Sequence, residues 1–588
     1  MTSVTPLYCS SIRSWLRHSS MSISLCRYTS RERSFITLLK ECIKRDFAKF
    51  INAPIVLFFR MKPSNGVQIK ASNNDITVST SSEIFANLRT QQGRLSKIAV
   101  LDINNENITI VWPYLLISIR NASFISLDLE LSGLGIRKGW SSQSLEDRYE
   151  VIRASAQTRA ILSIGISVFR LLKRKETDHK KRIKYQCQVF NILTLCAAPF
   201  VVEPDGLQFL ARHKFDFNHL INHGVSYGGD IARKNGGYDT LKGLWEEILS
   251  ASVPLTFHNG IVDLVFIYQH FYSNLPATLV EFLANICDWF TLDESGTPGF
   301  FDSKYLAEYS ARLKASYLEY VFRKCQRDNA VEASSSRAYI SIEFDDLPLS
   351  NDSIKTAFDV VDCQLPNAFL EAVIVTNSVS ERDAELICKK YAAFGFCNLN
   401  EKCNLVHNVD LVLDLEERKQ LKLRRRRKHR YDYAAKGIRI EDDRQEEKTS
   451  NDGSEEGSEL LTDNSCSIMT ADNSEVPDCS MELDNGLKEA ASRSIGDMER
   501  NALGCHRAGV DSFMTGFSVA FMSRMNVLRK GCFNSEEGNR LPLRGKATPL
   551  IIRKSEFAKR TKDHCIIWER IGKERSRIKH LRTLTFSS

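Results

Sequence analysis

Residues 124–135 read FISLDLELSGLG, an apolar run that carries two carboxylates and has two glycines near its end. We predict a buried β-strand, whose side chains alternate between two faces, so Asp128 and Glu130 share one face. Neighbouring carboxylates in an apolar setting are costly unless a cation compensates them, and oxygen ligands favour Mg²⁺ or Mn²⁺ over Zn²⁺. The alternative is a strand of an ordinary sheet with one solvated face.

A metal site needs further ligands, and Asp263 is the third candidate. It is the single acid in residues 261–268, an apolar stretch predicted as a helix that follows a short strand and turn. Its alternative role is to favour the dipole at the start of that helix. Asp302 is a rival ligand, but it precedes a predicted amphipathic helix running to about Lys324, where it fits an N-cap better.

The fourth candidate ligand lies far along the chain. Residues 505–522 predict a turn followed by an apolar helix, with His506 and Asp511 near its start. Such a helix needs a core to dock on, and the earlier part of the chain offers the only sizeable one. We therefore expect residues 500–525 to complete a fold that begins near residue 100.

The segments around the two-carboxylate strand predict an α/β fold. Two more apolar runs read as strands, at 160–169 and 185–192, and two stretches read as helices, at 111–119 (with Pro113 in its first turn) and 144–158. Strands that alternate with helices indicate an α/β sheet, here expected to be mixed at its edge. Residues 542–552 are a further strand candidate, and the basic tail after Lys554 is expected to be loose.

A second candidate metal centre follows, in which Cys388, Cys397, Cys403 and His407 have the spacing C-x8-C-x5-C-x3-H. Four such ligands suit tetrahedral structural Zn²⁺, and a module this short folds only with its metal. Three aromatic residues lie between the ligands beside lysines and suit stacking of unpaired RNA bases: Tyr391, Phe394 and Phe396. A purely structural or protein-binding finger is the alternative.

Charge is distributed unevenly along the 588 residues, whose formal net charge is +8. The run Arg418–Arg430 is densely cationic and predicts a nuclear-import signal or a nucleic-acid patch, centred on Arg424, Arg425, Arg426, Arg427 and Lys428. Residues 441–497 are rich in Glu, Asp, Ser and Asn and predict a disordered linker.

Composition narrows the class of protein. No apolar run is long enough for a transmembrane helix, so we expect no membrane partner. The 16 cysteines show no secreted-domain framework, which indicates a reducing compartment. Residues 1–60 are rich in Ser and Arg with no acid before Glu32, as in mitochondrial transit peptides. The favoured alternative is an extended N-terminus with Met61 as the effective start, because the cationic run indicates the nucleus.

The order of Asp128, Glu130, Asp263, His506 and Asp511 resembles that of the DEDDh deadenylases, the family of poly(A)-specific ribonuclease and the CCR-associated-factor deadenylases. The resemblance is most specific in LDLELSGLG at 127–135, HNGIVDLVF at 258–266, FDSKY at 301–305 and HRAGVDSFMTG at 506–516. The inserted finger resembles the nuclear, target-of-early-growth-response branch of that family. The resemblance implies an RNase-H-like fold, removal of 3′ adenosines as 5′-AMP from single-stranded RNA ends, and trimming of small nuclear RNAs. It also implies a nuclear location, with nucleoli, Cajal bodies or speckles as sites.

The chemistry follows from the residues. Four carboxylates can hold two Mg²⁺ or Mn²⁺ ions, and His506 is the candidate base for the attacking water. Gly133 and Gly135 would leave room for the terminal nucleotide. Two other functions stay open: a catalytically silent RNA-binding adaptor with a CCCH finger, and a DEDDh nuclease for DNA ends.

The predicted organisation is a disordered or targeting extension at 1–95, an exonuclease domain in two parts at 100–330 and 500–560, a zinc finger at 380–412, a basic run at 413–435, a disordered acidic linker at 436–499 and a basic tail at 561–588.

Overall fold

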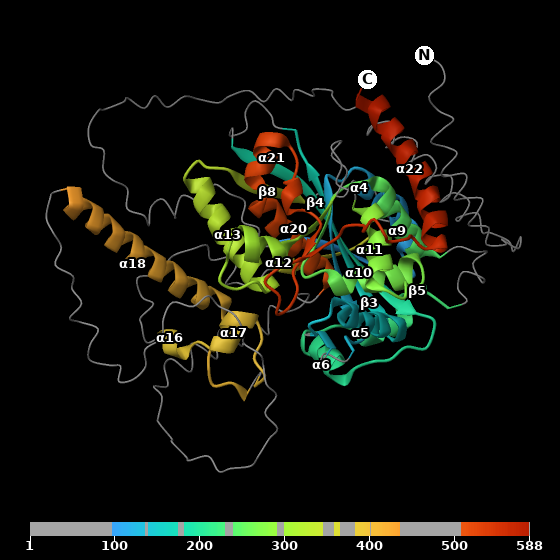
Figure 1. Ribbon diagram of the computed structural model, residues 1–588, viewed down its shortest axis with the longest axis horizontal. Helices are drawn as coiled ribbons and strands as arrows, with labels where there is room; N and C mark the ends of the chain where they lie inside the picture. The colour runs from blue at the N-terminus through green and yellow to red at the C-terminus, as the bar shows by residue number, and fades with distance from the viewer. Residues whose placement is uncertain are drawn as a thin grey trace, which may run out of the picture.

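The computed structural model describes residues 97–135, 139–140, 142–173, 181–229, 239–290, 299–344, 358–364, 383–399, 402–435 and 507–586. The predictions for residues 1–95 and 436–499, and for His506, lie outside the described residues. Within them, a central sheet is covered by helices on both faces, which confirms the predicted α/β fold (Figure 1).

The sheet has nine strands, seven of them in the order β7-β6-β2-β3-β4-β1-β9, with β5 and β8 pairing with β4. Their bounds are β1 Lys97–Ile103, β2 Phe124–Leu131, β3 Ile161–Leu171, β4 Arg182–Cys196, β5 Val225–Tyr227, β6 Leu255–Phe257, β7 Phe300–Asp302, β8 Tyr339–Phe344 and β9 Asp359–Gln364. The strands predicted at 124–131, 160–169 and 185–192 are therefore present as β2, β3 and β4.

The predicted mixed edge is present, because the edge strand β9 is antiparallel to β1, but the centre of the sheet is mixed as well. The central strand β3 is antiparallel to both β2 and β4, whereas β6 is parallel to β2 and β1 is parallel to β4. The chain between β3 and β4, residues 172–181, is too short for the crossover that parallel strands need, so it reverses the chain direction in the middle of the sheet.

Two hydrophobic cores lie on opposite faces of the sheet. One face is covered by α4 Ile108–Arg120, α5 Leu145–Thr158, α9 Thr240–Ala251, α10 Ile261–Ile267, the π-helix η2 Tyr268–Tyr272 and α11 Leu279–Trp289. The other is covered by α12 Ser303–Tyr305, η3 Leu306–Ser310, α13 Leu318–Ser334, α20 Ala508–Met522 and α21 Arg524–Lys530. The smaller helices α6 Pro204–Arg212 and α7 Phe217–His223 form a satellite cluster.

Helix α20 packs directly on the sheet, although it follows β2 by several hundred residues. The helix lies so close that a Cβ atom on Gly165 of β3 would come within 1.8 Å of the Ala508 carbonyl oxygen. The aromatic side chains of Phe513 and Phe517 are buried between α20, the sheet and α13. The segment that begins at Arg507 is thus an integral part of the domain that begins with β1.

Three local predictions need correction. The predicted helix to Lys324 is broken, because residues 311–317 are not helical and Arg312 has a left-handed φ of 50°. Residues 542–552 add no strand to the central sheet, since β10 Arg540–Leu541 and β11 Leu550–Ile551 pair only with each other. Helix α4 begins at Ile108, so Pro113 lies in its second turn.

The tail predicted to be loose is mostly a docked helix, α22 Lys562–Phe586. His564, Ile571 and Ile578 recur every seven residues and are all buried, so they form one face of the helix. The His564 ring lies 2.8 Å from the Tyr272 hydroxyl and 2.9 Å from a carboxylate oxygen of Asp288. This buried polar network ties α22 to η2 and α11.

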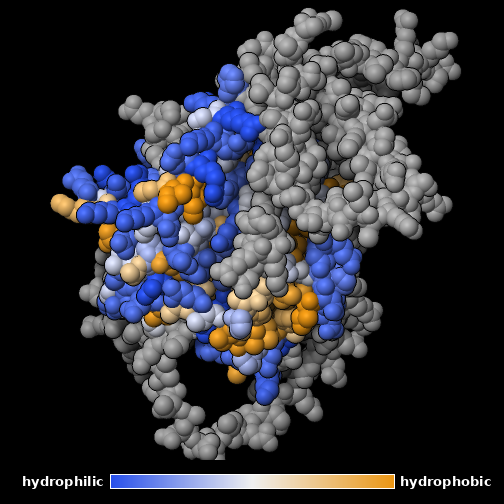
Figure 2. All heavy atoms as spheres, turned by 90° about the vertical axis from the view of Figure 1, so that its right-hand side faces the viewer, coloured by the Kyte–Doolittle hydropathy of each residue, from blue (hydrophilic) through white to orange (hydrophobic). Residues whose placement is uncertain are grey.

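The surface on the α22 side is mostly hydrophilic, with apolar residues gathered in separate patches (Figure 2). Among the helices that the structure describes, none is both long enough and apolar enough to cross a membrane.

Candidate active site

Three of the predicted carboxylates come together at one end of β2. Each of Asp128, Glu130 and Asp511 offers a carboxylate oxygen, and these atoms lie within 4.8 Å of one another. The first two residues are set by the alternation of β2, and the third lies in the first turn of α20. All three retain some exposure to solvent, which a substrate would need.

Asp263, the remaining predicted carboxylate, lies near this group of three. It lies in the first turn of α10, near enough for its negative charge to raise the pKa of both Asp128 and Glu130. Burial is the larger cause for both residues, followed by the charge of Asp511. Burial also raises the pKa of Asp263 and of Asp511 to about 7. Four desolvated carboxylates that repel one another form a site suited to divalent cations.

Asp302 is an N-cap, as its sequence position indicated. Its carboxylate is fully buried and accepts hydrogen bonds from the backbone amides of Lys304 (2.9 Å) and Tyr305 (3.1 Å). It also accepts one from the Gly260 amide at 2.9 Å, which fixes the start of α10. The residue therefore supports the helix that carries Asp263.

Sequence reasoning missed the contacts that hold α20 in place. The Arg507 guanidinium pairs with Asp102 of β1, at 2.9 Å between Nη2 and Oδ2 and 3.1 Å between Nε and Oδ1. Asn191 of β4 donates to the same Asp102 carboxylate at 3.0 Å and accepts from the Gly509 amide at 3.3 Å. These contacts fix the turn of α20 that carries Asp511. No sequence pattern marks Asp102 or Asn191, whose partners are far apart along the chain.

The two glycines after β2 lie at tightly packed positions of this loop, and their role of making room for a nucleotide stays a prediction. A Cβ atom on Gly133 would lie 2.6 Å from Glu203 Cδ, and one on Gly135, at φ 79°, would lie 1.9 Å from Ser155 Oγ. The Glu203 carboxylate accepts hydrogen bonds from the amides of Leu134 (3.1 Å) and Gly135 (2.7 Å). The left-handed φ favours glycine at position 135, whereas the close contact at Gly133 is with the end of the flexible Glu203 side chain.

The predicted zinc ligands also come together. The ligand atoms of the set, Cys388, Cys397, Cys403 and His407, lie within 4.8 Å of one another. The buried Nε2 atom of His407 makes no hydrogen bond to the residues that the structure describes. A hydrogen bond from the backbone of Tyr391 lowers the pKa of the Cys388 thiol, which favours the thiolate that a metal needs. This donor set fits Zn²⁺.

Of the three aromatics predicted to stack on RNA bases, Tyr391 is buried and unavailable. Its ring stacks on His407 at 4.9 Å and its hydroxyl donates to Glu319 of α13 at 3.1 Å. By contrast, Phe394 is 64% exposed and Phe396 is 59% exposed, with ring centres 6.2 Å apart. These two rings remain free to stack.

Glu319 lies between the two candidate metal centres. It accepts the hydrogen bond from Tyr391 of the cysteine–histidine cluster, and its charge contributes to the raised pKa of Asp511. The cluster packs further against the residue before α13, because Gly395, which has φ 75°, abuts the ring of the N-cap residue Tyr317. The cysteine–histidine cluster is therefore docked beside the carboxylate centre.

The cationic run lies on helix α18 Val409–Ala435. The side chains of Arg424 to Arg427 are exposed, and that of Lys428 lies outside the described ones.

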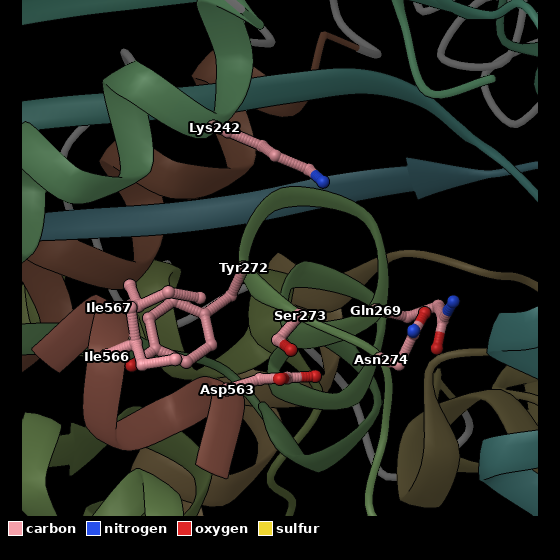
Figure 3. A pocket seen from close by; sticks show the side chains of 8 residues that line it. All are labelled: Lys242, Gln269, Tyr272, Ser273, Asn274, Asp563, Ile566 and Ile567. Atoms are coloured by element: carbon pink, nitrogen blue, oxygen red, sulfur yellow. The ribbon is translucent and has the colours of Figure 1, made fainter. Parts of the chain in front are cut away.

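A pocket of about 320 Å³ lies between α9, η2 and α22 and is lined by residues that include Lys242, Tyr272 and Asp563 (Figure 3). None of the four carboxylates lines it, so we do not assign it to the active site.

Comparison with known proteins gives one family. The family described as CAF1 family ribonuclease matches residues 103–235 and 231–519, which is most of the chain. Mouse poly(A)-specific ribonuclease PNLDC1 is 27% identical over 25% of this chain and 28% of its own length. Poly(A)-specific ribonuclease PARN of Arabidopsis thaliana is 30% identical over 18% of this chain and 16% of its own length. The chain thus matches less than a third of either relative. Among solved structures, the Mg²⁺- and Mn²⁺-bound Pop2p of Schizosaccharomyces pombe is 16% identical, with a TM-score of 0.29, over 39% of this chain and 82% of that one.

Proposed function

Since this chain belongs to the CAF1 family of ribonucleases, we propose that it is a metal-dependent 3′–5′ exoribonuclease that removes oligo(A) tails and releases 5′-AMP. The observation that carries the proposal is the convergence of Asp128, Glu130, Asp263 and Asp511 from three separate elements. A silent RNA-binding adaptor has no use for four carboxylates whose charges oppose one another, so we favour the enzyme.

The residues have distinct roles in this proposal. The four carboxylates would hold two Mg²⁺ or Mn²⁺ ions, which when bound lower the pKa of an attacking water and stabilise the leaving 3′ oxygen. His506, which directly precedes Arg507 in the sequence, would take the proton of that water at a ring nitrogen. Arg507 and Asn191 would position the start of α20, and with it Asp511.

The finger would bind Zn²⁺ and present Phe394 and Phe396 to unpaired bases near the 3′ end. Their exposure and the docking of the finger beside the carboxylate centre support this role. The assignment to the finger-bearing nuclear branch of the family, and small nuclear RNAs as substrates, rest on the sequence resemblance alone.

A nuclear location also remains a proposal, supported by the cationic run that includes Arg424 to Lys428. Import factors would then be partners. Changing Arg424 to Arg427 to Ala should move the protein from nucleus to cytoplasm. Loss of a mitochondrial signal on deletion of residues 1–60 would instead support the transit peptide.

The test compares oligo(A) RNA with oligo(dA) of equal length, each with and without Mg²⁺, and identifies the mononucleotide product. We expect Mg²⁺-dependent release of 5′-AMP from the 3′ end of the RNA. Equal or faster hydrolysis of oligo(dA) would favour the nuclease for DNA ends. Binding of RNA without hydrolysis, both with and without Mg²⁺, would favour the silent adaptor.

A further inference from the structure

Helix α18 changes the sign of its charge at the point where it leaves the body of the protein. Residues 409–417 contain four acids and no base, whereas residues 418–427 contain seven bases and no acid. The acidic part is packed against α13, and the side chains from Lys419 to Arg427 are exposed. In Figure 1 the helix projects from the rest of the described chain.

The acidic part is firmly anchored. Two arginines of α13, each only 2% exposed, pair with it: Arg323 with Asp410 at 2.6 Å, and Arg327 with Glu417 at 2.9 Å. Arg327 also pairs with Asp414. Val412 and Leu413 are buried in the same core as α13 and α20. These contacts fix the direction in which the rest of α18 projects.

The projecting part carries cations on every side. Successive residues of a helix are about 100° apart, so Arg424 to Arg427 point in four different directions. Like charges four residues apart, such as Arg418 and Lys422, destabilise an isolated helix. An anchored helix with this charge pattern becomes more stable when anions surround it.

We propose that the segment Arg418–Arg427 of α18 is a binding arm for the phosphate backbone of double-helical RNA, upstream of the 3′ end. This inference rests on the proposed function, because that function brings the 3′ end to the carboxylate centre. The arm would give the protein a second contact with the RNA, on the double-helical part upstream of the 3′ end.

Double-helical RNA fits the arm better than single-stranded RNA does. Proteins that hold single strands combine cations with aromatic rings, and residues 418–427 contain no aromatic residue. A duplex hides its bases and offers mainly phosphates, on two strands at once. The exposed Phe394 and Phe396 lie on the neighbouring finger, where they suit the unpaired part of the same RNA.

An import receptor fits the helical arm less well. A protein groove that reads an extended peptide cannot contact four arginines that point in different directions unless α18 unwinds. Phosphates of a duplex can approach the helix from more than one side. The import role therefore becomes one of the outcomes of the test.

The experiment uses the full chain and two RNAs with the same oligo(A) tail, one with a hairpin directly before the tail and one without. The variant replaces Arg424, Arg425, Arg426 and Arg427 with Gln. The control variant replaces four exposed cations elsewhere, Arg553, Lys559, Lys562 and Lys579, with Gln. Dissociation constants are measured over a range of salt concentrations, together with 5′-AMP release.

We expect the wild type and the control variant to bind the hairpin RNA more tightly than the tail alone. The arm variant should lose this preference, and its slope of log K against log salt should fall by roughly 0.7–0.9 for each phosphate that the arm no longer neutralises. Replacing the four arginines with Lys should keep most of the preference, because charge is retained. Hydrolysis of the tail alone should not change.

Equal affinity of the wild type for both RNAs would overturn the proposal. Unchanged affinity of the arm variant for the hairpin RNA would also overturn it, and loss of nuclear location of the same variant, observed in cells, would then favour the import receptor. Failure of the proposed function is seen separately: no 5′-AMP would then be released from either RNA, while the binding comparison would still report on the arm.

Discussion

The carboxylate centre and the cysteine–histidine cluster are both candidate metal sites, but the chain builds them in different ways. The cluster draws its four ligands from residues 388–407, whereas the carboxylate centre draws its ligands from β2, α10 and α20. A local site can be lost without unfolding the domain. A site assembled from distant segments depends on the whole domain, and on α20 above all.

The largest effect should come from removing α20. A chain that ends at residue 440 keeps Asp128, Glu130, Asp263 and the finger but lacks Asp511 and the buried Phe513 and Phe517. It should lose hydrolysis of oligo(A) completely. Its free energy of unfolding should also fall steeply, since one buried aromatic side chain contributes about 3–5 kcal/mol.

The control for this truncation adds residues 495–588 as a separate chain, which should restore part of the activity. Hydrolysis at the full rate by the truncated chain alone would mean that the fourth ligand is not Asp511, and Asp302 would then be the first alternative to test.

A mutation in the local site should have a more limited effect. Cys397→Ser should disorder residues 388–407 and weaken the binding of long RNA, while short oligo(A) is still cut. Zinc content, RNA affinity and the hydrolysis rate would be measured on the same preparation. Unchanged affinity for long RNA would show that the finger serves a protein partner or stability alone.

The carboxylate centre should make the stability of the protein depend on pH. Without metal, the raised pKa values of about 7 for Asp263 and Asp511 mean that the folded chain holds protons that the unfolded chain loses near pH 4. The free energy of unfolding should therefore fall as the pH rises from about 4 to about 7. Mg²⁺ offsets this loss, and at a hundred times its Kd it adds about 2.7 kcal/mol.

The measurement is the rise in Tm that Mg²⁺ causes, at pH 5.5 and at pH 8. The rise should be larger at pH 8, and Asp511→Asn should reduce it. An equal rise at both values would contradict a carboxylate metal centre.

The smallest effect should come from the contact between the two sites. Tyr391→Phe removes the hydrogen bond to Glu319 but keeps the ring stacked on His407. It should lower the free energy of unfolding by about 1–3 kcal/mol without changing RNA affinity. Phe394→Ala should weaken RNA binding without changing the free energy of unfolding, because that ring is exposed. Equal losses of RNA affinity in both variants would contradict this division.

The same contrast explains what the sequence could predict. The alternation in β2 fixes Asp128 and Glu130 on one face, and the spacing of the four zinc ligands is local, so both can be predicted without a structure. An aromatic residue between metal ligands gives no sign of which way it points, so the sequence pattern assigns Tyr391 to RNA although it packs on α13. The antiparallel pairing in the sheet centre depends on the short connection between β3 and β4, whose sequence carries no distinctive turn pattern.

Contacts between distant segments were the least predictable. The tail was predicted to be loose, but it docks as a helix. The sequence could not show this, because the buried His564 has its partners, Tyr272 and Asp288, almost 300 residues earlier in the chain. The pairing of Arg507 with Asp102 spans a still longer stretch of sequence. In both cases a polar residue is satisfied only in the folded chain, and hydrophobic periodicity alone cannot reveal its partner.

The most direct test of the account is the rate of 5′-AMP release by Glu130→Gln in the presence of Mg²⁺. The substitution keeps the size of the side chain and removes a charge from the carboxylate centre, so folding and RNA affinity should remain close to those of the wild type. We predict that 5′-AMP release falls to background. Retention of a substantial part of the wild-type turnover by the folded variant would contradict the assignment of this centre as the site of hydrolysis.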